Sequence, residues 1–349
     1  MLDNSHKLTF IALLFLITNA FSQNNSTEIK VLAFNIWSEG NIVENGYDAI
    51  VDEVARLSPE FVLFSEVRNA DNTNFGKRIS ASLKERGLKY YSFKSNDAGF
   101  ISKYPIIDST TIYGGDGQQG VGSIRKLVSI VDGKRFAIYV AHLHYLNCAY
   151  YLPRGYSGNT WRRLWWPVSS VKRISKMNRA SYRTESIMAL IEDANKEVAN
   201  GGNVILGGDF NEPSVQDWIE ENKNLYAHNG VVYPWDVSVH LLDNGYIDTY
   251  REKYPSPIDY PGFTCPSANK SIENSRLTFA PKSDSRERID YIFYKGQNYL
   301  KLKDVIIVGP NSCISFSKVV ESTSKDKFIE PLGVWPSDHK AVLATFEIK

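Results

Sequence analysis

Acidic, amide and imidazole side chains stand beside the ends of apolar runs along this chain of 349 residues. One such group is Ser337-Asp338-His339, which the apolar run 341–346 follows almost directly. Strand neighbours point to opposite faces, so Asp338 and His339 can share a site only where the chain is still a loop. There a carboxylate binds a hard cation, and an imidazole handles a proton or a phosphate oxygen. Solvated Asp-His pairs are common at strand ends, so this triplet alone is weak evidence.

Two carboxylates and one amide supply oxygen atoms that suit a divalent metal ion. Glu66 follows an apolar run, Asp338 precedes another, and Asn35 lies within a third. Mg²⁺ and Mn²⁺ prefer oxygen ligands, keep several waters and favour sites shared with a substrate phosphate. A metal held there would neutralise phosphate charge and orient the leaving oxygen. We therefore predict a site for Mg²⁺ or Mn²⁺, with Ca²⁺ as a further candidate.

The remaining candidates can move a proton or bind a phosphate. In-line attack on phosphorus needs a positioned water and donors for the equatorial oxygens. Asp209 is a candidate to orient or deprotonate that water, and the amide of Asn211 is a neutral donor. His142 and His339 can donate to the phosphate, while Asp290 can hold the His339 ring in one tautomer.

Each of these residues also has a purely structural interpretation. Glu66 can cap the next segment, and Asp209 with Asn211 can belong to an ordinary turn after two glycines. His142 can be a satisfied core histidine, and Asp290 can pair with a nearby arginine. Together and in this order, however, the set is poorly explained by chance.

The apolar pattern predicts strands interleaved with helices. We expect strands at 30–37, 61–64, 100–101, 106–107, 127–131, 136–140, 203–206, 289–294 and 340–346. We expect helices at 47–57, 75–86 and 183–198, and surface loops at 254–261 and 267–288. Glu66, Asp209 and Asp290 stand at the ends of three of these strands. Since α/β scaffolds build sites from strand ends, we expect them to meet at one edge of a sheet.

The N-terminus predicts export. Lys7 precedes a short apolar run and then small residues, which is the pattern of a secretory signal peptide over residues 1–22. A retained N-terminal anchor is the alternative. The remaining residues, 23–349, suffice for one large domain, and 43% hydrophobic and 13% aromatic residues support a sizeable core. For an exported chain with Cys148, Cys265 and Cys313, one disulfide and one free thiol are expected, without a fixed pairing.

Charge is segregated along the chain. The segment 145–183, called the insert below, holds eight basic residues, no acid, three tryptophans and five tyrosines. The net charge of +1 therefore leaves −7 for the rest of the chain. Such a segment either binds an anionic partner or packs its tryptophans inward beneath a solvated basic face.

The ordered motifs resemble one family. They are Phe34-Asn35-Ile36, Ser65-Glu66-Val67, Ser102-Lys103-Tyr104-Pro105-Ile106, Ala141-His142-Leu143, Gly207-Gly208-Asp209-Phe210-Asn211, Arg288-Ile289-Asp290-Tyr291 and Ser337-Asp338-His339. The set is similar to that of the endonuclease/exonuclease/phosphatase superfamily, which includes deoxyribonuclease I-like nucleases. The resemblance covers the chain from about Val31 onward. It implies an α/β four-layer sandwich, in which two packed mixed β-sheets are flanked by helices.

The resemblance also implies roles. Glu66 would be the main metal ligand, with Asn35 and Asp338 completing or supporting the site.

For the chemistry, Asp209 would position the nucleophilic water and Asn211 would bind the phosphate. His142 would contact the scissile phosphate or the leaving group, and Asp290 with His339 would form an Asp–His pair. The resemblance does not decide between Asp209 and His339 as the formal base.

Two departures from the family pattern matter. Ser65 stands where a glutamine often precedes the metal-binding glutamate, and the insert follows directly after the strand of His142. The insert should lie over the mouth of the site, where specificity is usually set. The predicted substrate-binding residues are Arg154, Tyr156, Trp161 and Arg162 of the insert, together with Thr264.

The favoured function is a secreted phosphodiesterase or phosphatase for a small or lipid-linked phosphate ester. The alternative is an extracellular nuclease whose basic, aromatic insert grips a DNA or RNA strand. The acidic remainder of the chain is poorly suited to bind a long duplex, whereas the tryptophans of the insert suit an anionic membrane surface. A binding protein with a decayed site is the least favoured interpretation.

Overall fold

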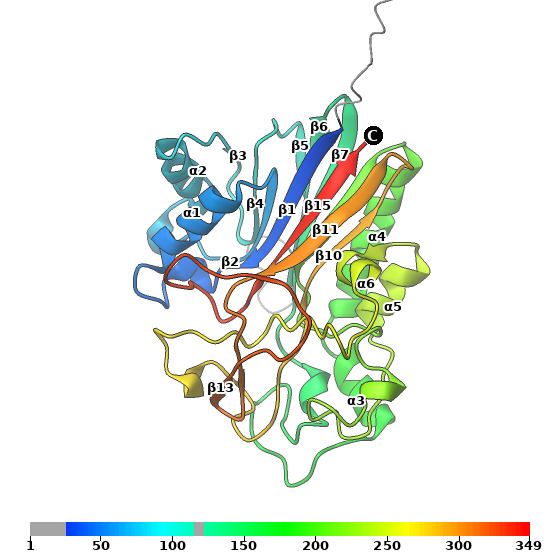
Figure 1. Cartoon of the computed structure of the whole chain (residues 1–349). Helices are drawn as coiled ribbons and strands as arrows, with labels where there is room; N and C mark the ends of the chain where they lie inside the picture. Colours follow the sequence, from blue (N-terminus) through cyan, green and yellow to red (C-terminus); the bar gives the residue numbers. More distant parts are fainter. Residues whose placement is uncertain (1–25, 115–121) are drawn as a thin grey trace, which may run out of the picture.

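The structure is a computed structural model that describes residues 26–114 and 122–349 (Figure 1). Two β-sheets pack face to face. The larger sheet has the order β14 (Phe328–Ile329), β11 (Leu300–Val308), β15 (Ala341–Ile348), β1 (Thr27–Asn35), β2 (Phe61–Val67), β4 (Asp97–Ser102) and β3 (Tyr91–Ser92). The smaller sheet has the order β5 (Asp108–Tyr113), β6 (Gly122–Val131), β7 (Lys134–Leu143), β8 (Asn203–Asp209), β10 (Asp290–Lys295) and β9 (Ile247–Asp248).

Both sheets are mixed. Strand β1 runs parallel to β2 and antiparallel to β15, and β7 runs parallel to β8 and antiparallel to β6. A separate hairpin joins β12 (Cys313–Ser315) to β13 (Lys318–Val320). The α-helices are α1 (Gly46–Leu57), α2 (Phe75–Glu85), α3 (Val171–Arg179), α4 (Arg183–Ala199), α5 (Asp236–Asp243) and α6 (Thr249–Lys253).

Strand β1 explains the continuous apolar runs, because both of its faces are buried. Val31 and Ala33 face the core between the sheets, while Leu32 and Phe34 face the layer that contains α1 and α2. A strand covered on both sides has no solvent face that needs polar residues. Helices α4 and α5 cover the outer face of the smaller sheet in the same way (Figure 1). The predicted four-layer sandwich is therefore confirmed.

Some predicted elements were wrong or missing. Residues 106–107 are not a strand; β5 begins at Asp108, and Ile107 is an exposed residue before it. Strand β11 and helices α3, α5 and α6 were not predicted. The stretch 267–288 is largely irregular and is a surface loop only in part: most of 270–282 is exposed, whereas Ser267, Ala280 and Glu287 are buried.

Two predictions concern the termini and the cysteines. The predicted signal peptide, 1–22, lies outside the described residues. All three cysteines are free, so the expected disulfide is absent from the part of the chain that the structure describes. No helix within 26–114 and 122–349 is long and apolar enough to cross a membrane.

Candidate active site

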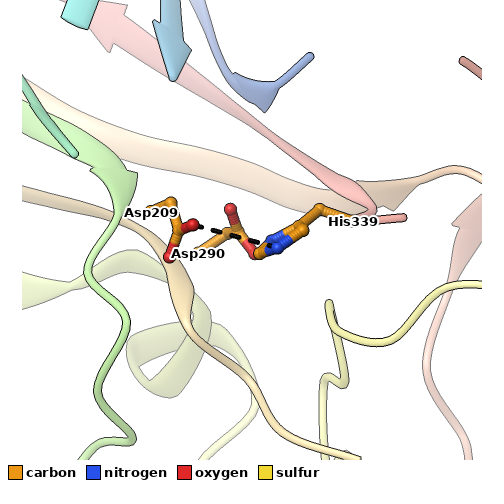
Figure 2. A group of neighbouring side chains, drawn as sticks. All are labelled: Asp209, Asp290 and His339. Atoms are coloured by element: carbon orange, nitrogen blue, oxygen red, sulfur yellow. Dashed lines mark hydrogen bonds and ion pairs between the residues drawn. The ribbon is translucent and has the colours of Figure 1, made fainter. Parts of the chain in front are cut away.

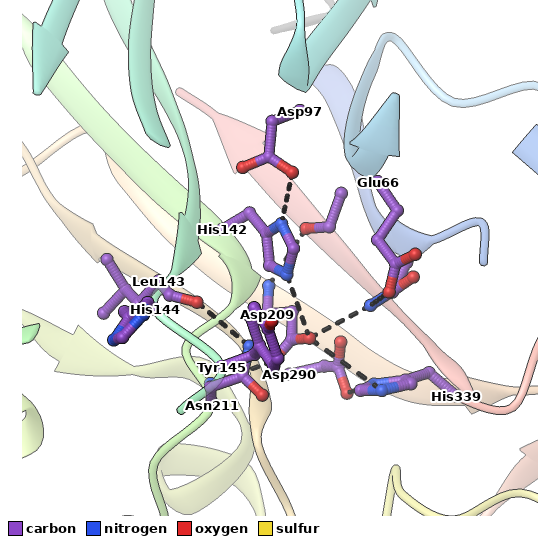
Figure 3. Close-up of polar contacts among 12 residues, drawn as sticks. Glu66, Asp97, His142, Leu143, His144, Tyr145, Asp209, Asn211, Asp290 and His339 are labelled. Atoms are coloured by element: carbon purple, nitrogen blue, oxygen red, sulfur yellow. Dashed lines mark hydrogen bonds and ion pairs between the residues drawn. The ribbon is translucent and has the colours of Figure 1, made fainter. Parts of the chain in front are cut away.

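The predicted catalytic and metal-binding residues converge at one edge of the two sheets. Strands β1, β2, β7 and β8 end there, while β4, β10 and β15 begin there. Figure 3 shows side chains from both sheets turned toward the space between these strand ends. The register between β8 and β10 places Asp209 directly opposite Asp290.

Asp209 lies at the centre of this group. Its Oδ2 accepts a hydrogen bond from Asn35 Nδ2 at 3.0 Å. The same oxygen lies 3.8 Å from Nε2 of His142 and 3.8 Å from Nε2 of His339. Burial, together with nearby Asp290, raises the pKa of Asp209 to about 6, although both imidazoles oppose the rise. At neutral pH its carboxylate is thus mostly ionised but close to its titration range.

His339 is oriented by two side chains. Its Nδ1 lies 2.9 Å from Asp290 Oδ2, and its backbone N–H donates to Ser337 Oγ at 3.0 Å. Burial opposes a charge on the ring, but the carboxylates of Asp290 and Asp209 raise the pKa of His339 well above its usual value. A protonated ring directs Nε2–H toward Asp209, and the predicted Asp–His pair is present.

His142 has a partner that the sequence did not reveal. Its Nδ1 lies 2.8 Å from Oδ1 of Asp97, the first residue of β4. Arg68 donates to the same oxygen at 2.6 Å. Burial lowers the pKa of His142, but Asp97, Asp209 and Glu66 outweigh it and raise the pKa to about 9. His142 is therefore a cationic donor whose Nε2 points into the site (Figure 3).

Glu66 faces the same space from β2. Its Oε2 accepts hydrogen bonds from the Ser38 backbone N–H at 3.1 Å and hydroxyl at 3.3 Å, and Arg68 lies 3.3 Å away. Its Oε1 accepts from Asn35 Nδ2 at 3.3 Å. Burial would raise the pKa of Glu66, but His142 and Arg68 dominate and lower it. Glu66 is therefore an ionised carboxylate, as a metal ligand must be.

Asp338 fits a metal site for a different reason. Its Oδ1 is buried and has no hydrogen-bond partner among the described residues. Burial, reinforced by Glu66, raises the pKa of Asp338 to about 7 despite the opposing charge of His339. An unsatisfied buried carboxylate oxygen is costly unless a cation compensates it. Asp338 and Glu66 thus form an oxygen-rich pair that a hard divalent cation would satisfy.

Asn35 supports this pair. Its amide nitrogen bridges Glu66 and Asp209, and its Oδ1 accepts from the backbone N–H of Trp37 at 3.0 Å. In this orientation, Asn35 fixes the two carboxylates relative to each other.

A second group of ligand-type atoms overlaps the site. Atoms of Asp209, Asp290 and His339 lie within 4.8 Å of one another (Figure 2). However, Asp290 is already bonded to Nδ1 of the His339 ring. The described side chains thus offer two groups of metal-ligand type at this edge, namely this trio and the Glu66–Asp338 pair.

Several site residues have positive φ angles. Glu66 has φ 70°, in the left-handed region that glutamate seldom adopts, whereas Asp97 with φ 63° and Asn211 with φ 49° are of types that tolerate it better. The register of β2 and β4 shifts between Ser65 and Val67, so Glu66 lies in a bulge. Bulges and strained residues concentrate at functional sites, where they redirect a side chain.

Ser65 and Asn211 hold Asp209 from opposite sides. The hydroxyl of Ser65, which stands at the usual glutamine position, accepts from the Asp209 backbone N–H at 3.3 Å. The backbone N–H of Asn211 donates to Asp209 Oδ1 at 2.8 Å, and its amide donates to the Leu143 carbonyl at 3.0 Å. One of the two amide hydrogens of Asn211 is thus already engaged.

Three of the predicted substrate-binding residues are internal. Arg154 is fully buried, pairs with Glu287 and donates to backbone carbonyls, so its prediction was wrong. Tyr156 is buried, and its hydroxyl accepts from the backbone N–H of Lys282. Thr264 is buried as well; its hydroxyl accepts from the backbone N–H of Asp290 at 3.2 Å and holds the start of β10. Thr264 thus positions Asp290, whereas Arg154 and Tyr156 join the insert to residues 282–287.

The other two remain candidates. Arg162 is exposed, and Trp161 lines a cleft beside the site. The green part of the chain that contains the insert lies at the end of the molecule opposite the C-terminus (Figure 1).

Comparisons with known proteins agree with this geometry. Residues 32–339 match the model of the Endonuclease/Exonuclease/phosphatase family. Protein F14F9.5 of Caenorhabditis elegans is 25% identical over 346 residues, which is 96% of this chain and 98% of that protein.

Two crystal structures are similar in fold. TDP2 of D. rerio, complexed with single strand DNA product, is 16% identical over 92% of this chain and 99% of that chain, with a TM-score of 0.51. The human Nocturnin catalytic domain with bound sulfate is 14% identical over 92% of this chain and 95% of that chain, with a TM-score of 0.50. With most of its length matched and its polar groups gathered at one sheet edge, the chain belongs to the endonuclease/exonuclease/phosphatase family of metal-dependent phosphoester hydrolases.

Proposed function

We propose that this enzyme hydrolyses a P–O ester by in-line attack of a water that Asp209 orients and deprotonates. The observation that carries the proposal is the position of Asp209 between the Nε2 atoms of His142 and His339, at 3.8 Å from each. A pKa of about 6 leaves Asp209 ionised at pH 7 yet basic enough to accept a proton. This makes Asp209, rather than the protonated His339, the base.

The two imidazoles then act as donors. His142, held protonated by Asp97, and His339, held by Asp290, direct their Nε2–H groups to the same space. Donors fixed before the reaction stabilise the charge that develops on phosphate oxygens in the transition state. Glu66 and Asp338 would hold a divalent cation, for which we propose Mg²⁺, with Mn²⁺ or Ca²⁺ as substitutes. When bound, the ion supplies charge neutralisation for the phosphate and the leaving oxygen.

A substrate panel tests this function. Bis-p-nitrophenyl phosphate, sphingomyelin, phosphoinositides, inositol phosphates, plasmid and RNA would be incubated with Mg²⁺ or Mn²⁺. We expect hydrolysis of at least one ester, abolished by EDTA and restored by the metal. Glu66→Gln and Asp209→Asn should each lower kcat by at least about 100-fold. Activity that survives EDTA, or that is unchanged in both variants, would refute the mechanism.

We further propose that the enzyme is exported and acts on a small or lipid-linked ester at a membrane surface. Trp165 and Trp166 are adjacent, 95% and 79% exposed. Backbone hydrogen bonds from Leu164 to Gly155 and from Val168 to Leu152 fix the chain on both sides of them. Two exposed indoles on an anchored loop suit the interface of a bilayer, where tryptophan is enriched.

The charges around this loop support an anionic surface. Six basic residues of the insert are exposed: Arg162, Arg163, Lys172, Arg173, Lys176 and Arg179. Within the described part of the chain, only Arg179 is recorded in an ion pair, with Asp236 at 3.9 Å. Basic residues near an anionic bilayer contribute about 1 kcal/mol each.

Vesicle sedimentation tests the membrane contact. We expect binding to phosphatidylcholine vesicles that contain phosphatidylserine, loss of binding in Trp165→Ala/Trp166→Ala, and normal binding in Ile130→Ala. Ile130 is a matched control because it is also exposed but lies at the opposite end of β6 from the site. Binding to a single-stranded oligonucleotide in place of vesicles would favour the nuclease. N-terminal sequencing of the mature protein should begin near residue 23 if the chain is exported.

A further inference from the structure

A cleft opens directly beside the catalytic residues. Asp338, His339 and Asn211 line one part of it. The rest is largely aromatic, with five rings: Tyr145, Tyr150, Tyr151, Trp161 and Phe279. Most of these rings come from the insert, so the insert forms a wall of the active site.

Trp161 and Phe279 form the outer part of the wall. Their ring centroids are 4.4 Å apart with an interplanar angle of 26°, and Tyr151 meets the Trp161 ring edge-on. Phe279 remains 53% exposed and Tyr145 54% exposed, so apolar ring surface is still open at the rim. Such open surface is available to a ligand without repacking of the core.

Trp161 is held there against a backbone cost. Its φ of 59° lies in the left-handed region, which a bulky residue rarely adopts. Its backbone N–H donates to the Ser157 carbonyl and keeps the turn closed. Glu66 shows the same kind of strain at the catalytic edge. Strain retained at a site points to a position that function requires.

The charge of the cleft restricts its occupant. No lysine or arginine lines it. Apart from cysteine and tyrosine side chains, its ionisable groups are those of the catalytic residues Asp338 and His339. A second phosphate group would find no cation in this cleft. Aromatic faces favour planar or apolar groups, and they also attract organic cations.

We propose that this cleft binds the organic group of the substrate, and that this group is uncharged or cationic and has a planar or apolar surface. The proposal rests on the proposed function, because it places the phosphate of the same molecule against His142, Asp209 and His339. It excludes polyphosphorylated head groups from this side of the site. Trp161 and Phe279 are assigned as the residues that determine specificity.

Calorimetric binding of two small phosphonates to the Mg²⁺-loaded protein tests the proposal. Phenylphosphonate presents a ring next to the phosphorus, and methylphosphonate is its matched control. We expect the phenyl compound to bind about tenfold more tightly to the wild-type protein. Trp161→Ala and Phe279→Ala should each reduce that ratio to about threefold or less, whereas Trp161→Phe should largely retain it.

Trp165→Ala is the control within the insert, because Trp165 is exposed and does not line the cleft. Phe279→Ala is included in case Trp161→Ala does not fold, since the half-exposed Phe279 can be shortened without opening the core. Equal affinity of the wild-type protein for the two phosphonates, or a ratio unchanged in both alanine variants, would overturn the proposal. If the protein prefers the phenyl compound but hydrolyses no ester, the proposal for the cleft stands and the proposed function is refuted.

Discussion

The Asp97–His142 contact gives the sharpest prediction about the chemistry. Asp97→Asn retains the size of the side chain and removes the negative charge that lies 2.8 Å from Nδ1 of His142. The pKa of His142, about 9, lies about 2.5 above its ordinary value of 6.5, which corresponds to about 3 kcal/mol in favour of the charged ring. Burial opposes that charge, and Asp97 is the first of the groups that overcome it.

Without the carboxylate of Asp97, the lowering of the pKa of His142 by burial is less fully opposed, and we expect this pKa to fall by about one to two units. The assay is an NMR titration of the imidazole in protein freed of metal by EDTA. With Mg²⁺, the alkaline limb of kcat/KM should move to lower pH by a similar amount, and kcat at pH 7 should fall by about 10- to 100-fold.

Arg68→Gln is the matched control, because it removes a cation from the same carboxylate. It should leave the pKa of His142 unchanged or slightly higher, opposite in sign to Asp97→Asn. The stability that His142 contributes is present below pH 6.5 and is lost as the pH rises through about 9. A pKa that stays near 9 in Asp97→Asn, or that falls equally in both variants, would refute the reasoning.

Three further predictions concern the metal site and the interior. Asp338→Asn should abolish metal-dependent hydrolysis but raise the Tm of the metal-free protein at pH 8. In the folded protein the pKa of Asp338 is raised to about 7, so the stability of the wild-type protein falls as the pH rises through 7 and this buried carboxylate ionises. The increase in Tm caused by roughly 10 mM added Mg²⁺ should be larger at pH 8 than at pH 5, because at pH 5 protons on Asp338 and Asp209 compete with the cation. Arg154→Ala should lower the free energy of unfolding in urea by about 3 to 5 kcal/mol, because it removes the cation from buried Glu287 and leaves that carboxylate to Trp218 and His228. The exposed Arg162→Ala should change it by less than about 0.5 kcal/mol.

The four-layer fold could be predicted largely because its central strands carry unambiguous patterns. Strands β1 and β8 are buried on both faces and appear as uninterrupted apolar runs, and the polar residues at their ends mark the site. Strand β11 was missed because its sequence, LKLKDVIIV, mixes lysines with apolar residues and follows no motif. It pairs with β15 over most of its length, so tertiary pairing decides its structure.

The insert shows why charge counts alone do not identify a binding surface. Of its eight basic residues, Arg154 and Arg183 are fully buried and pair with Glu287 and Glu212. Both partners lie far away in the sequence, so composition gave no sign that these cations serve the interior. The insert is therefore divided: two arginines and several aromatic rings pack inside, while six cations and two tryptophans remain exposed.

Asp97 and Arg68 show the same limit within the active site. Neither belongs to a recognised motif, although Arg68 directly follows Ser65-Glu66-Val67. Asp97 lies 45 residues from His142 in the sequence. The bulge that redirects Glu66 also brings Asp97 opposite Val67 at the start of β4, where its carboxylate reaches His142. Arg68 then links the two acids, because it contacts both Asp97 and Glu66. One irregularity in the pairing of β2 with β4 thus sets the metal ligand and the charge state of the histidine together, so a change that restores regular pairing there should impair both at once.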